Sequence, residues 1–448
     1  MAIQSKKEAI ILFLGDVFFL YLSLFTMLLI SYLGFPEEAH LDEHIIAFSI
    51  IFIIWITIFF IAGLYEKHTI LFKNRLPNII LNTQVINTFI AVLFFYLIPY
   101  FAITPKTNLF IYLILSFGLI LIWRIYGSAF IGDKVKGAAL IINSEEETRD
   151  LVEEVNNNSR YSFYFASIIS PDKSVKQLSK EILNEVKEKN ISYIIINLKS
   201  ERIKKILQDL YKLIYEGVEF IDKYKVYEDI FDRVPVSLLG YDWFLENLSL
   251  SPKVSYDLVK RMMDVIISLP LALLSLIFYP FVFLAIKMDD GGEIFIRQSR
   301  IGQDNKHVEI IKFRSMSGLD EGEEVLKSRR VVTKVGTFLR KSRIDELPQL
   351  WNVLKGDISL IGPRPEIPAL ALKYEEEIPY YNVRHLIKPG LSGWAQIYHD
   401  NHPHHGTDFS ETKMKLSYDL YYIKNRSFFL DLKIALKTIK ALLSRTGV

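Results

Sequence analysis

The sequence predicts a membrane protein with a four-transmembrane-helix bundle, a Rossmann-like α/β domain and a C-terminal α/β module. Three observations predict this fold class. Four long apolar runs lie in the first 131 residues. Short β-rich runs then alternate with charged helical stretches over about residues 136–220, and a fifth apolar run containing two prolines opens the C-terminal part. The chain has 448 residues, which is enough for two or three domains.

Composition limits the classes of function. The formal net charge is only +2, so overall electrostatics do not favour nucleic acid as a partner. The chain has no cysteine, which excludes disulfides and thiolate metal sites and is compatible with a reducing cytoplasm. Half of the residues are apolar, and they concentrate at the N-terminus. A lipid bilayer is therefore an expected partner, and no nucleic acid is expected.

The four apolar runs are each close to the roughly twenty residues that a helix needs to cross a bilayer. They are Ile10–Leu33, Ile45–Leu64, Ile79–Phe101 and Leu109–Phe130. An acidic loop follows the first run and a basic loop follows the second, while Arg124, Lys134 and Lys136 mark the last exit. The four runs make residues 1–131 the predicted transmembrane region, and the positive-inside rule places the N-terminus and all that follows this region in the cytoplasm.

Asp16 lies inside the first apolar run, where a carboxylate is expensive to bury. An intramembrane carboxylate can mark a functional site, but a position near the cytoplasmic end favours a carboxylate that is simply hydrated. The run is too long for a removable signal peptide and has no small-residue cleavage site, so we expect it to stay in the protein.

Residues 132–245 are predicted to form the Rossmann-like domain. The runs AALIIN, FYFASII, YIIINL and VEFI are typical of strands, and the charged stretches between them are typical of helices, which predicts a parallel sheet. A dinucleotide site needs a glycine-rich turn after the first strand, so that backbone N–H groups can approach the pyrophosphate. Here Glu145, Glu146 and Glu147 stand in that place. The domain is therefore predicted not to bind a nucleotide, which argues against a nucleotide-sugar oxidoreductase.

The fifth apolar run spans about residues 260–287 and has basic residues at both ends. Its length would allow a fifth crossing, but a crossing would carry the charged motifs that follow it away from the cytoplasm. Pro270 and Pro280 are expected to interrupt the run, because proline removes a helical hydrogen bond and kinks the helix. A re-entrant helix, which enters the bilayer and turns back, keeps both flanks on one side. An ordinary transmembrane helix is the alternative.

The segment RKSRIDE at residues 340–346 brings three basic side chains next to two adjacent carboxylates, Asp345 and Glu346. Such cations screen the repulsion between a carboxylate and a phosphate, one carboxylate can hold Mg²⁺, and the other can attack phosphorus. A solvated helix start is the alternative, since acidic residues are favourable near a helix N-terminus. The neighbouring motifs favour the chemical interpretation.

Four further motifs accompany this segment: KFRSM at 312–316, GDISLIGPRPE at 356–366, RHLIKPGLSGWAQ at 384–396 and YDLYYI at 418–423. Together with the acidic pair they resemble the bacterial polyprenyl-phosphate sugar-phosphate transferases, also called monotopic phosphoglycosyl transferases. The resemblance covers roughly residues 256–440. More loosely, the rest of the chain resembles the long form of this family, with N-terminal transmembrane helices and a Rossmann-like domain.

The resemblance implies that residues 246–448 form an α/β catalytic module with a re-entrant membrane helix. Its activity would be transfer of a sugar 1-phosphate from a nucleotide diphosphate sugar, a UDP-sugar in this family, to polyprenyl (undecaprenyl) phosphate, which initiates surface polysaccharide or O-antigen synthesis. The protein would lie in the bacterial inner membrane with its soluble domains in the cytoplasm, and a homodimer is compatible with this. The sequence does not specify the sugar.

The resemblance also implies roles for individual residues. Asp345 would attack the β-phosphate and form a covalent aspartyl-phosphosugar intermediate, and Glu346, with Asp345, would hold Mg²⁺, the expected cofactor. Lys312 and Arg314 alternate along a predicted strand, so both are expected on one face. The implied phosphate-binding residues are Lys312, Arg314, Arg340, Arg364 and Arg384, with Arg343 as a further candidate.

A non-enzymatic membrane scaffold or sensor that regulates glycan assembly is the alternative function, and the intact acidic pair with its cations argues against it. The chain also departs from the family. Ser275 stands apart from Pro280, whereas members usually carry a Ser-Pro pair in the re-entrant helix, so the bend position is open.

Two C-terminal segments keep two interpretations each. Histidines 399, 402, 404 and 405 cluster in a loop that could bind metal or be a solvated loop. Residues 428–447 space apolar residues helically against lysines, as in an interfacial amphipathic helix or a soluble packing helix.

Overall fold

The computed structural model describes most of the chain and divides it into two compact units, Met1–Ile230 and Phe231–Val448. The described residues are 6–35, 37–65, 76–98, 107–130, 136–142, 146–158, 161, 163–198, 200–236, 239–248, 254–317, 331–398 and 409–444. The histidine cluster and the turn at Glu145 lie outside them, so the interpretations of both segments stay predictions. The predicted domain boundaries, 131/132 and 245/246, also stay predictions.

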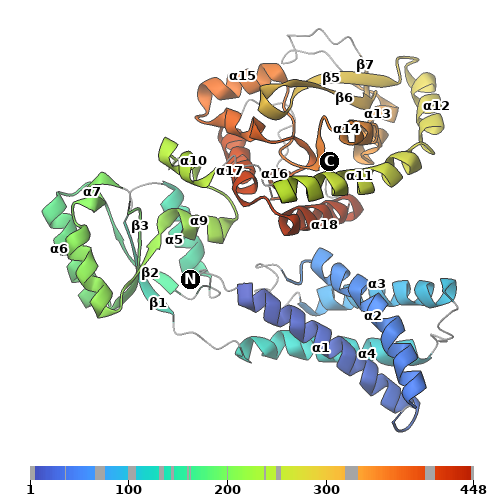
Figure 1. Ribbon diagram of the computed structural model, residues 1–448, viewed down its shortest axis with the longest axis horizontal. Helices are drawn as coiled ribbons and strands as arrows, with labels where there is room; N and C mark the ends of the chain where they lie inside the picture. The colour runs from blue at the N-terminus through green and yellow to red at the C-terminus, as the bar shows by residue number, and fades with distance from the viewer. Residues whose placement is uncertain are drawn as a thin grey trace. The chain divides into compact units, whose positions relative to one another are not determined.

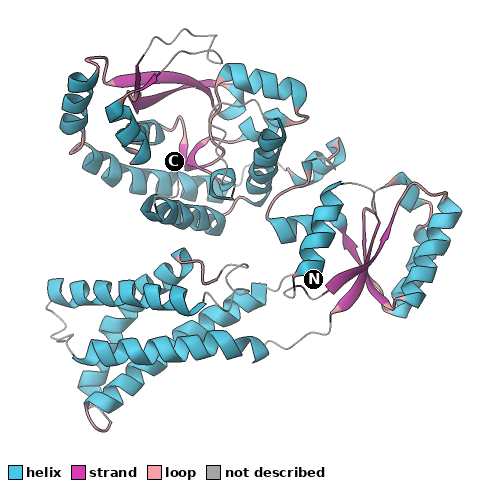
Figure 2. Ribbon diagram, turned by 180° about the vertical axis from the view of Figure 1, so that it is seen from behind, coloured by secondary structure: helices cyan, strands magenta, loops and turns pink. Residues whose placement is uncertain are grey.

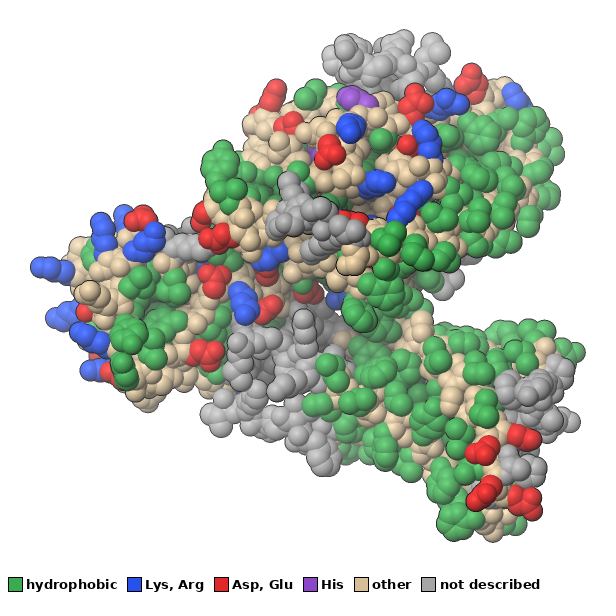
Figure 3. Space-filling model, viewed as in Figure 1, with side chains coloured by type: hydrophobic (Ala, Val, Ile, Leu, Met, Phe, Trp, Pro, Cys, Tyr) green, Lys and Arg blue, Asp and Glu red, His purple; other side chains and the backbone are tan. Residues whose placement is uncertain are grey.

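The first unit begins with four helices, and each is long and apolar enough to cross a membrane, as the sequence predicted (Figure 1). They are α1 (Lys6–Ser31), α2 (Glu38–Ile61), α3 (Leu76–Leu97) and α4 (Thr107–Phe130). Their inward faces form one apolar core, and large apolar side chains also cover the outward faces visible in Figure 3. Helices that are apolar on all sides suit a lipid environment.

Asp16 is not hydrated, and that expectation is wrong. Its carboxylate is fully buried between α1 and α4 and forms an ion pair with Arg124, whose Nε lies 3.1 Å from Oδ1. The Tyr65 hydroxyl donates to Asp16 Oδ2 at 2.8 Å, and Arg124 also donates to the carbonyl oxygen of Leu64 at 2.6 Å. Every charge in this group therefore has a partner, as a buried ion pair requires.

The second half of this unit is an α/β domain with a four-stranded parallel sheet in the order β2-β1-β3-β4, which confirms the predicted parallel sheet (Figure 2). The strands are β1 (Gly137–Ile142), β2 (Phe163–Ile169), β3 (Ile191–Ile196) and β4 (Glu219–Asp222). The helices are α5 (Glu146–Asn157), α6 (Val175–Glu188), α7 (Glu201–Lys204), α8 (Leu207–Tyr211), the 3-10 helix Lys212–Glu216 and α9 (Lys223–Phe231). Figure 1 shows α5 and α6 on opposite faces of the sheet.

In the second unit, helices surround three two-stranded sheets. Its helices are α10 (Tyr241–Asn247), α11 (Val254–Ser275), α12 (Tyr279–Asp289), α13 (Lys334–Lys341), α14 (Gln349–Lys355), α15 (Pro368–Glu377), α16 (Trp394–Tyr398), α17 (Phe409–Asn425) and α18 (Phe428–Ser444), with 3-10 helices Gln303–Asn305, Ile344–Glu346 and Tyr381–Leu386. Its strands are β5 (Phe295–Ile301), β6 (His307–Phe313), β7 (Met316–Ser317), β8 (Val331–Val332), β9 (Ser359–Ile361) and β10 (Gly390–Ser392). The pairs β5–β6 and β7–β8 are antiparallel, whereas β9–β10 is parallel.

The fifth apolar run forms α11 and α12, which meet at a bend of 55°. The break covers residues 276–278, between the two prolines. Pro270 stays inside α11 and does not interrupt it, contrary to the prediction, whereas Pro280 lies in the first turn of α12, where its missing N–H is harmless. Large apolar side chains are exposed on both sides of the break, and Figure 3 shows this apolar surface.

The first half of α11 is anchored in the second unit. Arg261 donates to the carbonyl oxygens of Val353 and Leu354, each at 2.6 Å, and so satisfies the C-terminal end of α14. Asp264 accepts from the Ser359 hydroxyl at 3.1 Å and from the backbone N–H of Leu360 at 3.0 Å. The apolar helix pair is therefore tied to the strand that leads into the functional site.

Candidate active site

The floor of the site is one face of the β5–β6 hairpin. In its register Arg300 pairs with Val308, and Ile296 pairs with Lys312. Side chains at alternate positions share a face, and directly paired residues of an antiparallel ladder point to the same side. Arg300 and Lys312 therefore project from the same face, although they come from different strands.

The acidic pair is placed by a sharp change of direction after α13. Arg343 adopts a left-handed conformation with φ of 57°, and the short 3-10 helix Ile344–Glu346 starts directly after it. A left-handed conformation is unfavourable for a residue with a side chain, so the surrounding structure must impose it. The turn buries the Asp345 side chain, which is only 8% exposed, and aims Glu346 at β6.

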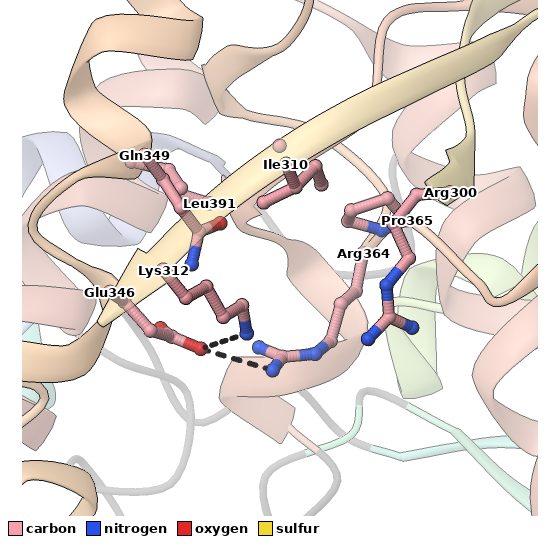
Figure 4. Close-up of a pocket in the computed structure, with 9 residues that line it drawn as sticks. Arg300, Ile310, Lys312, Glu346, Gln349, Arg364, Pro365 and Leu391 are labelled. Carbon is pink, nitrogen blue, oxygen red and sulfur yellow. Dashed lines mark hydrogen bonds and ion pairs between the residues drawn. The ribbon is translucent and has the colours of Figure 1, made fainter. Parts of the chain in front are cut away.

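Glu346 is held by two cations. Lys312 Nζ and Arg364 Nη2 each lie 3.2 Å from its Oε1 atom (Figure 4). Burial alone would raise the pKa of Glu346, but the charges of Arg364, Lys312 and Arg343 outweigh it and lower the pKa to about 2. Glu346 is therefore ionised at any physiological pH.

Asp345 has the opposite environment. Its Oδ1 atom is buried and has no hydrogen-bond partner among the described residues. Burial, together with the neighbouring charge of Glu346, raises the pKa of Asp345 to about 6. Two adjacent carboxylates are thus pushed to different pKa values, which is typical of active sites, where such groups take separate roles. Asp345 is therefore mostly ionised at neutral pH and poorly solvated, and its Oδ1 accepts no hydrogen bond from the described residues, which suits a nucleophile.

A small pocket of about 20 Å³ opens beside Glu346 (Figure 4). It is lined by Arg300, Ile310, Lys312, Glu346, Gln349, Arg364, Pro365, Gly390 and Leu391. Three of these residues are cations, and the buried Nε2 of Gln349 has no partner within the described part of the chain. The pocket therefore offers donors and positive charge to an anion.

Arg300 is a pocket residue that sequence reasoning missed. The sequence did contain a signal for Arg300. Ile296, Gln298 and Arg300 occupy every second position of their strand and so share one face, as Ile310 and Lys312 do on theirs. What the sequence did not provide was the register of the hairpin, which places the two cations on one face.

The loop that carries Arg364 is fixed at its backbone. The N–H of Ile301 donates to the carbonyl oxygen of Glu366 at 2.9 Å, and Arg384 donates to that of Arg364 at 2.9 Å. Gly362 and Gly390 let β9 and β10 approach closely, since a Cβ on Gly390 would lie 2.1 Å from the nitrogen of Gly362. The Arg364 guanidinium therefore starts from a rigid backbone.

The structure brings only part of the predicted phosphate-binding set to the pocket. Lys312 and Arg364 line it, and the charge of Arg340 acts on Asp345. Arg314 follows the end of β6 and forms an ion pair with Asp290 at 3.1 Å.

Arg384 is 5% exposed and pairs with Asp419 at 2.9 Å and Glu366 at 3.3 Å. Neither Arg314 nor Arg384 lines the pocket, so their contacts with phosphate stay predictions.

The carboxylate oxygens of the site can hold Mg²⁺ only if substrate oxygens complete the coordination of the ion. Mg²⁺ commonly takes one or two carboxylates from a protein, with phosphates and waters as the other ligands. The unpartnered Oδ1 of Asp345 and the adjacent Glu346 can supply this part. Over the described ranges there is no group of three or more His, Asp or Glu side chains that could hold an ion alone. The site thus fits an ion that arrives with a phosphorylated substrate.

Comparison with known proteins gives matches over this unit. The family described as "Bacterial sugar transferase" matches residues 255–445. A UDP-N-acetylgalactosamine-undecaprenyl-phosphate N-acetylgalactosaminephosphotransferase of Aeromonas hydrophila is 42% identical over 208 residues, which are 44% of this chain and 47% of that protein.

Two further relatives extend this picture. A UDP-glucose:undecaprenyl-phosphate glucose-1-phosphate transferase of Caulobacter vibrioides is 40% identical over 43% of this chain and 73% of its own length. The exopolysaccharide production protein PSS of Rhizobium leguminosarum bv. phaseoli is 37% identical over 42% of this chain and 98% of its own length. The chain thus matches about half the length of the Aeromonas relative but nearly all of PSS. The family match over residues 255–445 includes every residue that lines the pocket.

Proposed function

The chain belongs to the bacterial sugar transferase family, and we propose that it transfers a sugar 1-phosphate from a UDP-sugar to undecaprenyl phosphate at a membrane surface. The names of its relatives support this donor and this acceptor, and they differ in the sugar. Glucose and N-acetylgalactosamine are therefore the first sugars to test. The name of the relative PSS, an exopolysaccharide production protein, supports the further proposal that the reaction starts the assembly of a surface polysaccharide.

The observation that carries the proposal is the contrast between Asp345 and Glu346. A pocket that only bound phosphate would need cations, and a buried carboxylate without a donor would weaken it. Asp345 is such a carboxylate, and it lies next to a cation-lined pocket. A covalent role gives this arrangement a chemical purpose, because a nucleophile must reach phosphorus as a free anion.

In the first half-reaction, an oxygen of Asp345 forms a bond to the β-phosphorus of the donor. The bond from that phosphorus to the bridging oxygen breaks, and the electron pair leaves with UMP. Lys312 and Arg364 are placed to neutralise the phosphate oxygens on which charge accumulates, while Glu346 holds these two cations in place. The product on the protein is an aspartyl phosphosugar.

In the second half-reaction, a phosphate oxygen of the lipid acceptor attacks the same phosphorus. The bond to Asp345 breaks, and the carboxylate is regenerated. Splitting the transfer in this way lets a water-soluble donor and a lipid acceptor use one site in turn. Asp345 and Glu346 would hold Mg²⁺ together with substrate oxygens, and that ion would supply Lewis-acid stabilisation of the phosphate charge.

We further propose that α11 and α12 form a re-entrant helix in the bacterial inner membrane, with both soluble parts in the cytoplasm. The 55° break supports this, as do the basic residues at both ends of the run and the anchoring of α11 beside the site. A full crossing would separate Asp345 from cytoplasmic nucleotide donors.

Single cysteines in this cysteine-free chain test the topology by labelling of intact cells with an impermeant maleimide. Positions Ser255 and Gln303 flank the helix pair and should stay unlabelled until the membrane is permeabilised. Glu38, in the predicted outer loop, should label at once. Labelling of Gln303 together with Glu38 would show a full crossing and contradict the re-entrant arrangement.

The function itself is tested with membranes that contain the protein, undecaprenyl phosphate and a panel of UDP-sugars. We expect UMP release with one donor and a lipid product heavier by that sugar phosphate. Membranes that contain the Asp345→Asn variant serve as the control. If no donor releases UMP in the presence of acceptor, the transferase proposal fails and a non-enzymatic role is favoured.

A further inference from the structure

Among the described residues, Arg300 is the pocket cation that has no carboxylate partner. Its guanidinium donates to the side-chain oxygen of Gln298 at 3.0 Å, and within the described ranges it forms no ion pair. Lys312 and Arg364, in contrast, both contact Glu346 (Figure 4). Figure 4 shows the Arg300 side chain beside that of Arg364, with no dashed line to it, whereas the Arg364 guanidinium reaches Glu346.

The carboxylates near Arg300 are already engaged. Glu346 accepts from Lys312 and Arg364, and Glu366 is paired with Arg384 at 3.3 Å. Burial, with the repulsion of Arg364, lowers the pKa of Arg300 to about 10, so the group remains charged at neutral pH. A partly buried charge without a counter-ion is unfavourable, and an anion in the pocket would relieve it.

This anion can bind Arg300 without breaking an existing ion pair. A phosphate that bound Lys312 or Arg364 would compete with Glu346 for their charges, whereas Arg300 is available from the start. A guanidinium also presents a planar fork that matches two phosphate oxygens. Arg300 is thus better suited than its neighbours to a phosphate that must enter and leave in every cycle.

We propose that Arg300 binds the phosphate monoester that departs from, or attacks, the β-phosphorus on the side away from Asp345. This assignment rests on the proposed function. In-line displacement puts the leaving oxygen and the attacking carboxylate on opposite sides of phosphorus. UMP leaves along this line in the first half-reaction, and the acceptor phosphate approaches along the same line in the second. Both are phosphate monoesters, so one guanidinium serves both in turn.

The half-reactions separate the two sources of phosphate. Transfer of the sugar phosphate onto the protein is measured by UMP release without acceptor, and the second step by chasing the labelled protein with undecaprenyl phosphate. We expect Arg300→Gln to slow each step about 100- to 1,000-fold, as loss of one charge-stabilising donor does elsewhere. Arg300→Lys should retain more activity than Arg300→Gln, because it keeps the charge but loses the fork.

Arg297→Gln is the matched control. Arg297 lies on the same strand, but its side chain is 72% exposed and pairs with Glu309 at 3.7 Å on the opposite face of the hairpin. Its rates should stay within about twofold of the wild type, since exposed pairs contribute little. Equal rates for the Arg300→Gln and Arg297→Gln proteins would overturn the inference. An effect on only one half-reaction would overturn the shared role and assign Arg300 to that phosphate alone.

A binding measurement keeps this inference separate from the transferase proposal. Calorimetry with inorganic pyrophosphate and with UMP on the detergent-solubilised full chain should give affinities at least tenfold weaker for Arg300→Gln than for Arg297→Gln. If the wild type binds both ligands through Arg300 but transfers no sugar, the phosphate site stands and the proposed function fails. If it transfers sugar and the two variants bind alike, the function stands and the Arg300 site is refuted. Arg300→Lys, which keeps the charge, applies the same test if Arg300→Gln does not fold.

Discussion

The membrane bundle and the second unit both bury aspartates, and Asp16 of the bundle and Asp345 of the second unit have opposite surroundings. Asp16 has both carboxylate oxygens occupied, by Arg124 and by the hydroxyl of Tyr65. Asp345 keeps a buried oxygen with no donor among the described residues, although several cations lie close to it. An ion-pair partner offsets the cost of burying a charge, whereas a buried carboxylate without such a partner lowers stability and is typical of active sites.

The strongest way to break this comparison is Asp345→Asn. We expect turnover to fall by at least about 10⁴-fold, as when other covalent nucleophiles are removed, because an amide cannot form the phosphate ester. We also expect the free energy of unfolding at pH 7 to rise by about 1–3 kcal/mol. The folded-state pKa of about 6 lies above the ordinary value of 3.8, so the ionised form is the one that folding disfavours.

Glu346→Gln gives the opposite sign and is the control for this stability measurement. The folded-state pKa of Glu346, about 2, lies below its ordinary value of 4.5, so its ionised form contributes stability above pH 4.5 that is lost as the pH falls toward 2. Removing that charge should lower the free energy of unfolding by about 2–3 kcal/mol. If chemical denaturation shows both variants shifting in the same direction, the contrast between the two carboxylates is wrong.

Asp16→Asn tests the other side of the comparison. Breaking a buried pair by removing one charge commonly costs about 3–5 kcal/mol, because the partner is left uncompensated. We expect a large loss of thermal stability of the bundle in detergent, while the KM for the donor changes less than about twofold. The double variant Asp16→Asn with Arg124→Gln should recover part of the loss. A catalytic defect at full stability would instead make Asp16 functional, the interpretation that the sequence left open.

The sequence could predict features that depend on local patterns, but it could not predict contacts between residues far apart in the chain. The apolar runs, the parallel sheet and the Asp345-Glu346 pair follow from local patterns, namely run length, strand–helix alternation and adjacent charges. The partner of Asp16 lies 108 residues away in the chain, so no local pattern could identify it.

The same limit explains the other differences at the site. Arg300 needed the hairpin register, and the break at residues 276–278 needed the packing around it rather than the position of a proline. Arg384 belonged to a basic motif, but only the fold shows that its charge is already matched by Asp419 and Glu366.

A smaller effect concerns pH. Asp345 must be ionised to attack phosphorus, so kcat/KM for the donor should follow a group with a pKa of about 6 and fall about tenfold between its plateau and pH 5. Glu346, with a pKa of about 2, stays ionised over this range and cannot cause the decline. Burial also raises the pKa of Asp419 to about 6, so the profile must be repeated in Asp419→Asn. If the decline of kcat/KM toward pH 5 disappears in that variant, the decline reports Asp419 and not Asp345.

The last test asks whether an ion-pair partner always gives a buried aspartate a structural role. Asp419 is 1% exposed and pairs with Arg384, which in turn holds the carbonyl oxygen of Arg364 at 2.9 Å. Like Asp16 it has an arginine partner, but its buried Oδ2 makes no hydrogen bond among the described residues, and Arg384 fixes the backbone beneath a pocket cation. We therefore expect Asp419→Asn to lower both stability and kcat/KM, the latter by about tenfold, since a shift of about 1 Å at a positioning residue can cost that much or more.

Asp419→Glu separates a positioning role through Arg384 from a purely structural role, because this variant keeps the charge and its carboxylate can still reach Arg384. Restored activity in this variant, at whatever stability, would show that Asp419 acts through the charge it presents to Arg384. If activity instead tracks the melting temperature across Asp419→Asn, Asp419→Glu and Asp16→Asn on one line, Asp419 is structural in the same sense as Asp16. An ion-pair partner would then be sufficient to identify a structural aspartate, and Asp345, for which the described residues provide no such partner, would be set apart for chemistry.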